Sequence, residues 1–341
     1  MTAAALEPAD LVGLASGDGL GAATELLESV IYPRLRVSGG QDDGAWTPTL
    51  AGAWQVVTTD LFAVDPIEFP GGNIGKLAAA GCINDLLASG ARARTLTVGL
   101  YLSAYLQREV LGRMLDAFRT ELDRAGAEVV CGDTKVHPGR DPLLLLAVTA
   151  VGEPIGDRRY TLAEAVPGDL LMVTGPLGAH TIAVLSAREG LGFERVVRSD
   201  VQPLLSPISA LVERSLARCL RDLTRGGLVG ALWEGARASG LLWEIDADAV
   251  PVDRDVRAAT ELLGLDPLTL ANEGTMLLGV PPAEAGEVLR LLHGHDATAR
   301  TAVVGRIAPA ADGVGAAVVR DGEGSAKVLP YPAGIGIPRL C

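Results

Sequence analysis

The stretch TTDLFAVDPIEFPGGNIGKLAAAGCINDLLASGA, residues 58–91, decides the fold class of this 341-residue chain. Residues 50–64 read as two β-strands, and the second of them ends near Asp60. Residues 71–91 place apolar side chains at helical spacing between glycines, which predicts a helix. Strands that alternate with helices in this way are typical of α/β and α+β domains.

The alternation continues to about residue 330. Further strands are expected at residues 93–102, 128–136, 142–153, 166–175, 274–280 and 301–307, and further helices at 108–126, 180–191 and 228–240. We expect residues 128–136 to be a short buried strand that runs into a loop, and residues 219–227 to be a polar loop. The pattern predicts an α/β (α+β) protein with two domains, residues 1–157 and 158–330. From about Tyr331 the composition shifts toward proline and glycine with no apolar period, which predicts a flexible tail at residues 331–341.

Composition excludes several classes of function. The net charge of −13 argues against nucleic-acid binding and against anionic membrane surfaces. The N-terminus lacks a signal-peptide pattern and no apolar run is long enough to span a membrane, so we expect a cytoplasmic protein. The four cysteines are too widely spaced for a disulfide framework or a zinc site. Three of them, Cys82, Cys131 and Cys219, are predicted to be core residues.

Aspartates occur at expected strand ends and in loops in the first half of the chain. They are Asp42, Asp43, Asp60, Asp85 and Asp133. Magnesium commonly binds proteins through a few carboxylates together with substrate phosphates, so these acids are candidate ligands. The alternative is that they are ordinary loop and helix-cap residues.

Four glycine-rich segments are candidate phosphate-binding loops: residues 16–21, 70–76, 132–135 and 221–227. Glycines let backbone N–H groups approach phosphate oxygens, and a helix N-terminus favours anions. No segment matches a P-loop or a dinucleotide-binding fingerprint, so plain turns remain the alternative.

The chain ends on a thiol, Cys341, in the sequence GIGIPRLC. A thiolate on a tail can enter a pocket as a nucleophile or as a covalent carrier. Eight extended residues reach about 26 Å, enough to cross one face of a domain. The alternative is an incidental terminal cysteine.

Together these segments resemble the HypE family, the carbamoyl dehydratases of hydrogenase maturation. The likeness rests on residues 58–91, CGDTKV (131–136), HTIAVLSAREGL (180–191), RDLTRGGL (221–228), ELLGLDPLTLANEG (261–274) and the terminal PRLC. It runs in order from about Ser16 to Cys341. Residues that depart from the family pattern include Leu61, Asn73 and Leu223.

The resemblance implies an aminoimidazole ribonucleotide synthetase-like fold, with residues 1–157 as an ATP-binding and dimerisation domain. It implies that Cys341 receives a carboxamide from a HypF-like carbamoyltransferase. ATP then phosphorylates the amide oxygen, and loss of phosphate leaves a thiocyanate. The nitrile passes to iron on a HypC–HypD-like scaffold. ATP, Mg²⁺ and a homodimer are therefore expected.

The same resemblance implies a role for each matching residue. The expected catalytic residues are Cys341, Lys135 and Glu273, with Glu273 as a candidate base. The expected ATP contacts are Lys76, Asp60, Asp85, Asp133, Thr134, Arg225, Gly226 and Gly227. The expected Mg²⁺ ligands are Asp42, Asp43, Asp60, Asp85 and Asp133.

Three alternatives remain open at this point. The same nitrile chemistry could serve a biosynthetic acceptor. The chain could be a small-molecule synthetase of the same superfamily, which would leave Cys341 unexplained. It could also be a non-catalytic docking scaffold.

Overall fold

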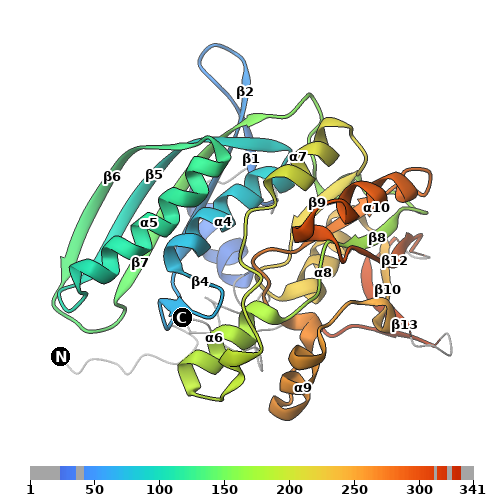
Figure 1. Cartoon of the computed structure of the whole chain (residues 1–341). Helices are drawn as coiled ribbons and strands as arrows, with labels where there is room; N and C mark the ends of the chain where they lie inside the picture. The colour runs from blue at the N-terminus through green and yellow to red at the C-terminus, as the bar shows by residue number, and fades with distance from the viewer. Residues whose placement is uncertain (1–23, 36–41, 311–312, 321–324, 332–341) are drawn as a thin grey trace, which may run out of the picture.

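The computed structural model describes residues 24–35, 42–310, 313–320 and 325–331. Two sheets lie side by side, and each has helices packed against it (Figure 1). The chain passes from the first sheet to the second near residue 160. The predicted mixture of strands and helices is confirmed. The glycine-rich segment 16–21 and the tail residues 332–341, including Cys341, lie outside the described residues.

The first sheet has five strands in the order β1-β2-β7-β5-β6. Neighbours are antiparallel except β5 and β6, which are parallel. The strands are β1 (Ala45–Pro48), β2 (Trp54–Phe62), β5 (Ala91–Ser103), β6 (Glu128–His137) and β7 (Leu144–Pro154). Two helices lie over one face of this sheet, α4 (Ile74–Ala88) and α5 (Arg108–Ala125) (Figure 1).

Helix α4 is the central helix of the molecule, and nearly all of its residues are buried. Its N-cap is Asn73, whose side-chain oxygen accepts a hydrogen bond of 3.0 Å from the backbone N–H of Lys76. An amide oxygen caps a helix as well as a carboxylate does, so Asn73 retains this role. A Cβ on Gly75 would lie 1.8 Å from the carbonyl oxygen of Met114, so glycine is required where α4 crosses α5.

Strand β6 differs from the prediction of a buried strand. Its residues 128–136 are all exposed, including the apolar Val130 and Val136, and Cys131 is also exposed. The segment 132–135 lies inside this strand and forms no loop. The prediction was wrong because apolar content alone cannot distinguish a strand covered by its own chain from an open edge strand. Cys82 and Cys219 are buried, as predicted.

The second sheet has seven strands in the order β14-β13-β10-β12-β8-β11-β9. They are β8 (Leu170–Val173), β9 (Cys219–Asp222), β10 (Leu242–Asp246), β11 (Met276–Val280), β12 (Ala302–Ala308), β13 (Ala316–Arg320) and β14 (Ala326–Val328). Residues 219–222, expected in a loop, are thus a strand. The associated helices are α6 (Ala179–Glu189), α7 (Leu205–Glu213), α8 (Gly227–Ser239), α9 (Arg254–Leu263) and α10 (Ala285–His293).

Shorter elements include η2 (Leu27–Ile31), α3 (Tyr32–Leu35), β3 (Glu68–Phe69) and β4 (Gly72–Asn73), and 3₁₀ turns η3 (Leu162–Glu164), η4 (Phe193–Arg195), η5 (Ala247–Ala249), η6 (Pro267–Thr269) and η7 (Asp296–Thr298). One hydrophobic core joins the two halves, because residues of α4 and of α7 belong to the same buried cluster. A second core lies around Trp243 in the second sheet. Among the described residues, no helix is both long and apolar enough to cross a bilayer.

Candidate active site

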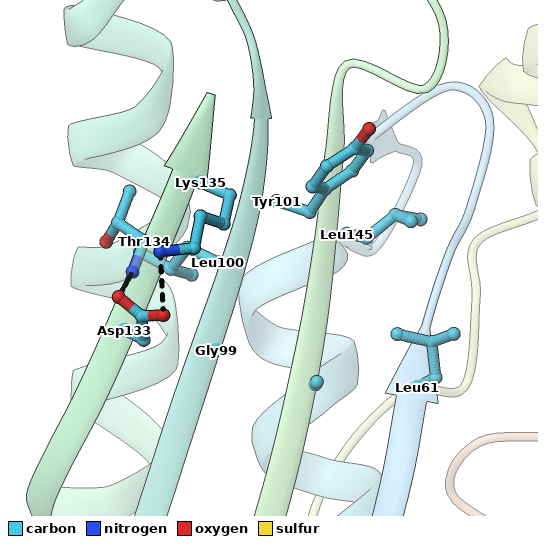
Figure 2. Close-up of a pocket in the computed structure, with 9 residues that line it drawn as sticks. Leu61, Gly99, Leu100, Tyr101, Asp133, Thr134, Lys135 and Leu145 are labelled. Carbon is cyan, nitrogen blue, oxygen red and sulfur yellow. Dashed lines mark hydrogen bonds and ion pairs between the residues drawn. The ribbon is translucent and has the colours of Figure 1, made fainter. Parts of the chain in front are cut away.

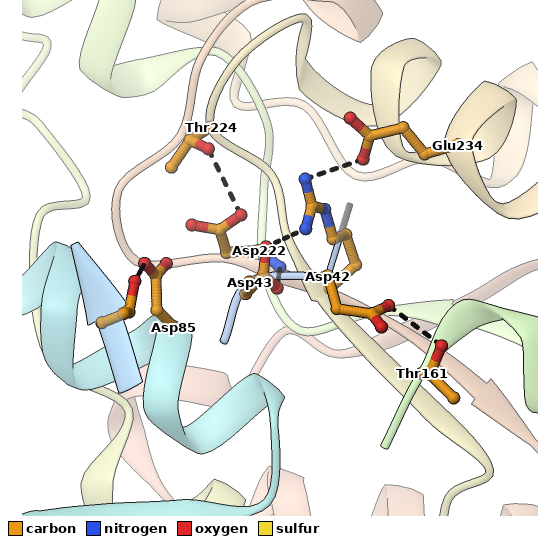
Figure 3. Close-up of polar contacts among 9 residues, drawn as sticks. Asp42, Asp43, Asp85, Thr161, Asp222, Thr224 and Glu234 are labelled. Carbon is orange, nitrogen blue, oxygen red and sulfur yellow. Dashed lines mark hydrogen bonds and ion pairs between the residues drawn. The ribbon is translucent and has the colours of Figure 1, made fainter. Parts of the chain in front are cut away.

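Three buried carboxylates meet where the two halves of the chain join (Figure 3). They belong to Asp43, which precedes β1, Asp85 on α4, and Asp222 at the end of β9. One oxygen from each lies within 4.8 Å of the others. We call this cluster the acid triad. An all-oxygen donor set of this size suits Mg²⁺.

Hydroxyl groups orient two members of the triad. The Thr58 hydroxyl on β2 donates to Asp85 over 2.7 Å, and the Thr224 hydroxyl donates to Asp222 over 3.2 Å. Each bond leaves carboxylate lone pairs available for a further partner.

The chain turns from β9 into α8 directly beside Asp222. Gly226, with φ of 77°, is the N-cap of α8, and Gly227 has φ of 57°. A Cβ on Gly227 would lie 2.5 Å from the carbonyl oxygen of Leu270, so both backbone angle and space require glycine. The N-terminus of this helix, which carries a partial positive charge, begins five residues after Asp222.

Leu223 follows Asp222 and explains one departure from the family pattern. Its side chain is fully buried, and its backbone N–H donates to the carbonyl oxygen of Thr275 over 3.2 Å. A proline could not make that bond, whereas leucine adds both the bond and core packing.

Arg221 connects the triad to α8. It pairs with Asp43 on one side and with Glu234 of α8 on the other, the latter over 2.8 Å (Figure 3). The three side chains are all largely buried. This pairing fixes the orientation of Asp43 and compensates part of the negative charge at the site.

Burial raises the pKa of all three triad carboxyls. Arg221 opposes the increase in the pKa of Asp43 and Asp222, while neighbouring carboxylates add to it. For Asp85 the main additional cause is Asp60, whose charge raises the pKa further. A buried cluster of like charges is unfavourable on its own and favours a cation.

The other predicted acids occupy different places. Asp60 lies on β2 opposite Val148, and so on the face of the sheet that α4 covers, close enough to the triad to raise the pKa of Asp222. The carboxylate of Asp42 accepts a hydrogen bond of 3.0 Å from Thr161 and points away from the triad (Figure 3).

Asp133 lies on the opposite, open face of the first sheet. Leu61, Ala147, Gly99 and Asp133 form one row across the strands, and they line a hollow on that face (Figure 2). Asp133 there accepts a hydrogen bond from its neighbour Thr134 and forms an ion pair of 3.3 Å with Lys135. Within one chain, therefore, Asp133 and Lys135 do not reach the triad.

Lys76 lies in the first turn of α4, nine residues before Asp85, which separates the two by about 13 Å along the helix. Its ammonium group donates to the carbonyl oxygen of Gly71 over 3.4 Å. Burial lowers its pKa, and the nearby charges include Glu121 and Asp200. Lys76 is thus at the other end of α4 from the triad.

Glu273 lies in the loop before β11, whose first residue Met276 pairs with Asp222. Burial raises the pKa of Glu273 well above its usual value, and the charges of Asp222, Asp200 and Asp60 raise it further. Its carboxyl group forms no hydrogen bond with any residue that the structure describes. A carboxyl group in such surroundings can accept or hold a proton.

Sequence reasoning missed Asp222, Arg221 and Glu234. Asp222 carried one sequence signal, because it lies in the glycine-rich segment 221–227 that was already a candidate phosphate-binding segment. The pairing of Arg221 with Glu234 carried none, since it depends on how α8 packs against β9.

Comparison with known proteins defines the class. Residues 41–153 match the N-terminal domain of AIR synthase related proteins, and residues 166–317 match the C-terminal domain. The fold and the two matches together define an AIR synthase-related protein.

Individual relatives show which family within the AIR synthase-related proteins this chain resembles. The carbamoyl dehydratase HypE of Rhodobacter capsulatus is 35% identical over 335 residues, covering 97% of this chain and 98% of the relative. A chain of the HypE–HypF complex crystal structure superimposes with a TM-score of 0.84 at 30% identity, covering 90% of this chain and 99% of that one. A crystal structure of HypE in complex with ATP superimposes with a TM-score of 0.78 at 33% identity, and the match covers 92% of this chain and 96% of that one. This chain belongs to the carbamoyl dehydratase HypE family.

Proposed function

We propose that this chain is an ATP-dependent dehydratase that converts an S-carboxamide on Cys341 into a thiocyanate for hydrogenase maturation. The observation that carries the proposal is the acid triad beside the Gly226–Gly227 start of α8, in a chain of the HypE family. A site of this kind suits the phosphates of ATP together with Mg²⁺.

The reaction balances as a phosphorylation followed by an elimination. The carboxamide oxygen attacks the γ-phosphorus of ATP and ADP leaves. The C–O bond then breaks, the oxygen departs with phosphate, and the nitrogen loses its two protons, one to Glu273 and one to the departing phosphate, to form C≡N. The carboxamide oxygen is a poor leaving group until it carries the phosphoryl group, so ATP supplies the driving force.

Different residues would bind the metal, bind the phosphates and accept a proton. Asp43, Asp85 and Asp222 would hold Mg²⁺, with Asp60 nearby, and a bound Mg²⁺ would offset negative charge on the phosphates. Arg225 and the backbone of Gly226 and Gly227 bind phosphate oxygens at the start of α8. Glu273 accepts a proton from the carboxamide nitrogen.

The open face of the first sheet supports a homodimer. It exposes Leu61 and Tyr101, and strand β6 at the edge of the sheet exposes Val130 and Val136. An edge strand offers unpaired backbone groups to another chain, and exposed apolar side chains favour a partner surface. Pairing of two such faces brings Lys135, Asp133 and Thr134 into the interface, where we place them around the ATP and the carboxamide.

The last described residue before the tail packs against α8, the helix that begins at Gly227. Tyr331, the last residue described, packs against Trp233 of α8 with ring centroids 5.6 Å apart, and its hydroxyl accepts a hydrogen bond of 3.2 Å from Arg237. Trp233 is adjacent to Glu234, which pairs with Arg221. Ten residues follow Tyr331, and such a chain spans at most about 35 Å. Cys341 can therefore reach the site from α8.

The relatives suggest the partners. The solved complex pairs HypE with HypF, so we infer that a HypF-like carbamoyltransferase loads Cys341 of this chain. A HypC–HypD-like scaffold is the proposed acceptor of the nitrile.

Affinity for Mg²⁺ is expected to increase with pH. The raised pKa values keep protons on the triad over a range where an exposed aspartate is ionised, and a cation must displace them. The apparent Kd should therefore fall as pH rises from about 5 to about 8, and level off once the triad is ionised. Calorimetric titration in two buffers of different ionisation enthalpy measures both Kd and the protons released. Affinity independent of pH, with no proton release, would contradict binding at the triad.

Replacing Lys135 by Ala is expected to abolish dehydration without unfolding the chain. Its ion pair with Asp133 is exposed and contributes little to stability. The test uses chain carbamoylated at the tail, and follows phosphate release after Mg-ATP is added. Lys327→Ala, which removes an exposed lysine on β14, is the matched control. Full activity in Lys135→Ala would remove this residue from the site, and no phosphate release in the unsubstituted chain would refute the function.

A further inference from the structure

The loop that carries Glu273 is held by a half-buried carboxylate, Asp200, which lies outside the acid triad. Asp200 accepts hydrogen bonds from the backbone N–H groups of Glu273 and Gly274, over 3.1 and 3.0 Å. It also accepts one from the Thr275 hydroxyl over 3.2 Å. Three consecutive residues are thus fixed by one side chain.

Asn84 of α4 holds the same loop from the other half of the molecule. Its amide donates to the carbonyl oxygens of Gln202 and Glu273, over 3.1 and 3.4 Å, and its oxygen accepts from the N–H of Leu204 over 2.9 Å. Asn84 is buried and adjacent to Asp85 of the triad. One turn of α4 therefore contacts both the triad and the Glu273 loop.

The segment that carries Asp200 is itself tightly held. The Ser199 N–H donates to the carbonyl oxygen of Pro70, and the Ser199 hydroxyl lies 2.8 Å from Nδ1 of His180. Burial lowers the pKa of His180 to about 3, so its ring stays neutral. A Cβ on Gly274 would lie 2.0 Å from the carbonyl oxygen of Asp200, so the two backbones are in direct contact.

These contacts fix the backbone of Glu273 on both sides while its carboxyl group makes no hydrogen bond with a described residue. We propose that Asp200 and Asn84 are positioning residues, which hold Glu273 at a fixed place relative to the acid triad. The inference rests on the proposed function, in which Glu273 acts as the base. A displacement of about 1 Å in a proton acceptor can lower a rate about 100-fold.

The test is a double-mutant cycle on carbamoylated chain in single-turnover phosphate release. Asp200→Asn should lower the maximal rate about 10- to 100-fold and change the half-saturating ATP concentration less than about 2-fold. In a Glu273→Gln background, Asp200→Asn should cause almost no further loss, because both changes remove the same function. Losses that multiply, or an equal increase in half-saturating ATP, would overturn the proposal.

A second pair of variants guards against misfolding. Thr275→Val removes only one of the donors to Asp200 and should slow the reaction several-fold, whereas Thr275→Ser keeps the hydroxyl and should retain the rate. Equal rates in the two variants would also overturn the proposal. If the unsubstituted chain releases no phosphate, the proposed function itself fails, and the two failures are thereby distinguished.

Discussion

Replacing Asp222 by Asn is expected to lower the rate of ATP-dependent dehydration by at least about 100-fold, because the acid triad would hold the Mg²⁺ that binds the phosphates. The substitution removes one of three carboxylates whose oxygens lie within 4.8 Å of each other. An amide is neutral and a weaker cation ligand, so binding of Mg²⁺ should weaken in parallel. Phosphate release and calorimetric titration measure the two effects.

Stability separates this effect from misfolding. Asp222 is buried with a raised pKa, and an amide oxygen can still accept the bond from Thr224. The thermal midpoint without metal should therefore stay the same or increase. Asp42→Asn is the matched control, because Asp42 points away toward Thr161. Full activity in Asp222→Asn, or an equal loss in Asp42→Asn, would contradict the assignment.

Replacing Cys341 by Ala is expected to reduce the activity to background. No other group in the proposed reaction carries the carboxamide, so nothing remains for ATP to phosphorylate. The matched control is Cys131→Ala, which removes an exposed cysteine on β6 and should leave the activity unchanged. Labelling with the carbamoyl donor, followed by phosphate release, tests both variants. Phosphate release that persists in Cys341→Ala would show that the carrier is another group.

The fold could be predicted because apolar spacing, glycine positions and capping residues along the chain indicate the same helices and strands. The glycines and apolar spacing of residues 71–91 predict α4, and Asn73 then caps it in the structure. Strand β6 was predicted to be buried because its valines look like core residues, whereas they lie on the edge strand of the sheet and are exposed. A sequence pattern indicates which side chains are apolar. It does not indicate whether the same chain or another chain covers those side chains.

The site could be predicted only in part. Two of the candidate acids, Asp43 and Asp85, lie together in the structure, but the third member of the triad, Asp222, comes from a distant strand. Asp133 was grouped with these acids, yet strand alternation places it on the opposite face from Asp60. The positions of Asp200 and Asn84 depend on how α4, residues 199–204 and the loop before β11 pack together, which no local pattern encodes.

The most direct test is the intact mass of the chain after its tail has been carbamoylated and Mg-ATP has been added. We expect a loss equal to the mass of one water molecule, located in the C-terminal peptide that contains Cys341, with one phosphate released per chain. An unchanged mass with ATP turnover on a free metabolite would indicate a small-molecule synthetase. An unchanged mass without ATP turnover would contradict enzymatic activity altogether and favour a docking scaffold.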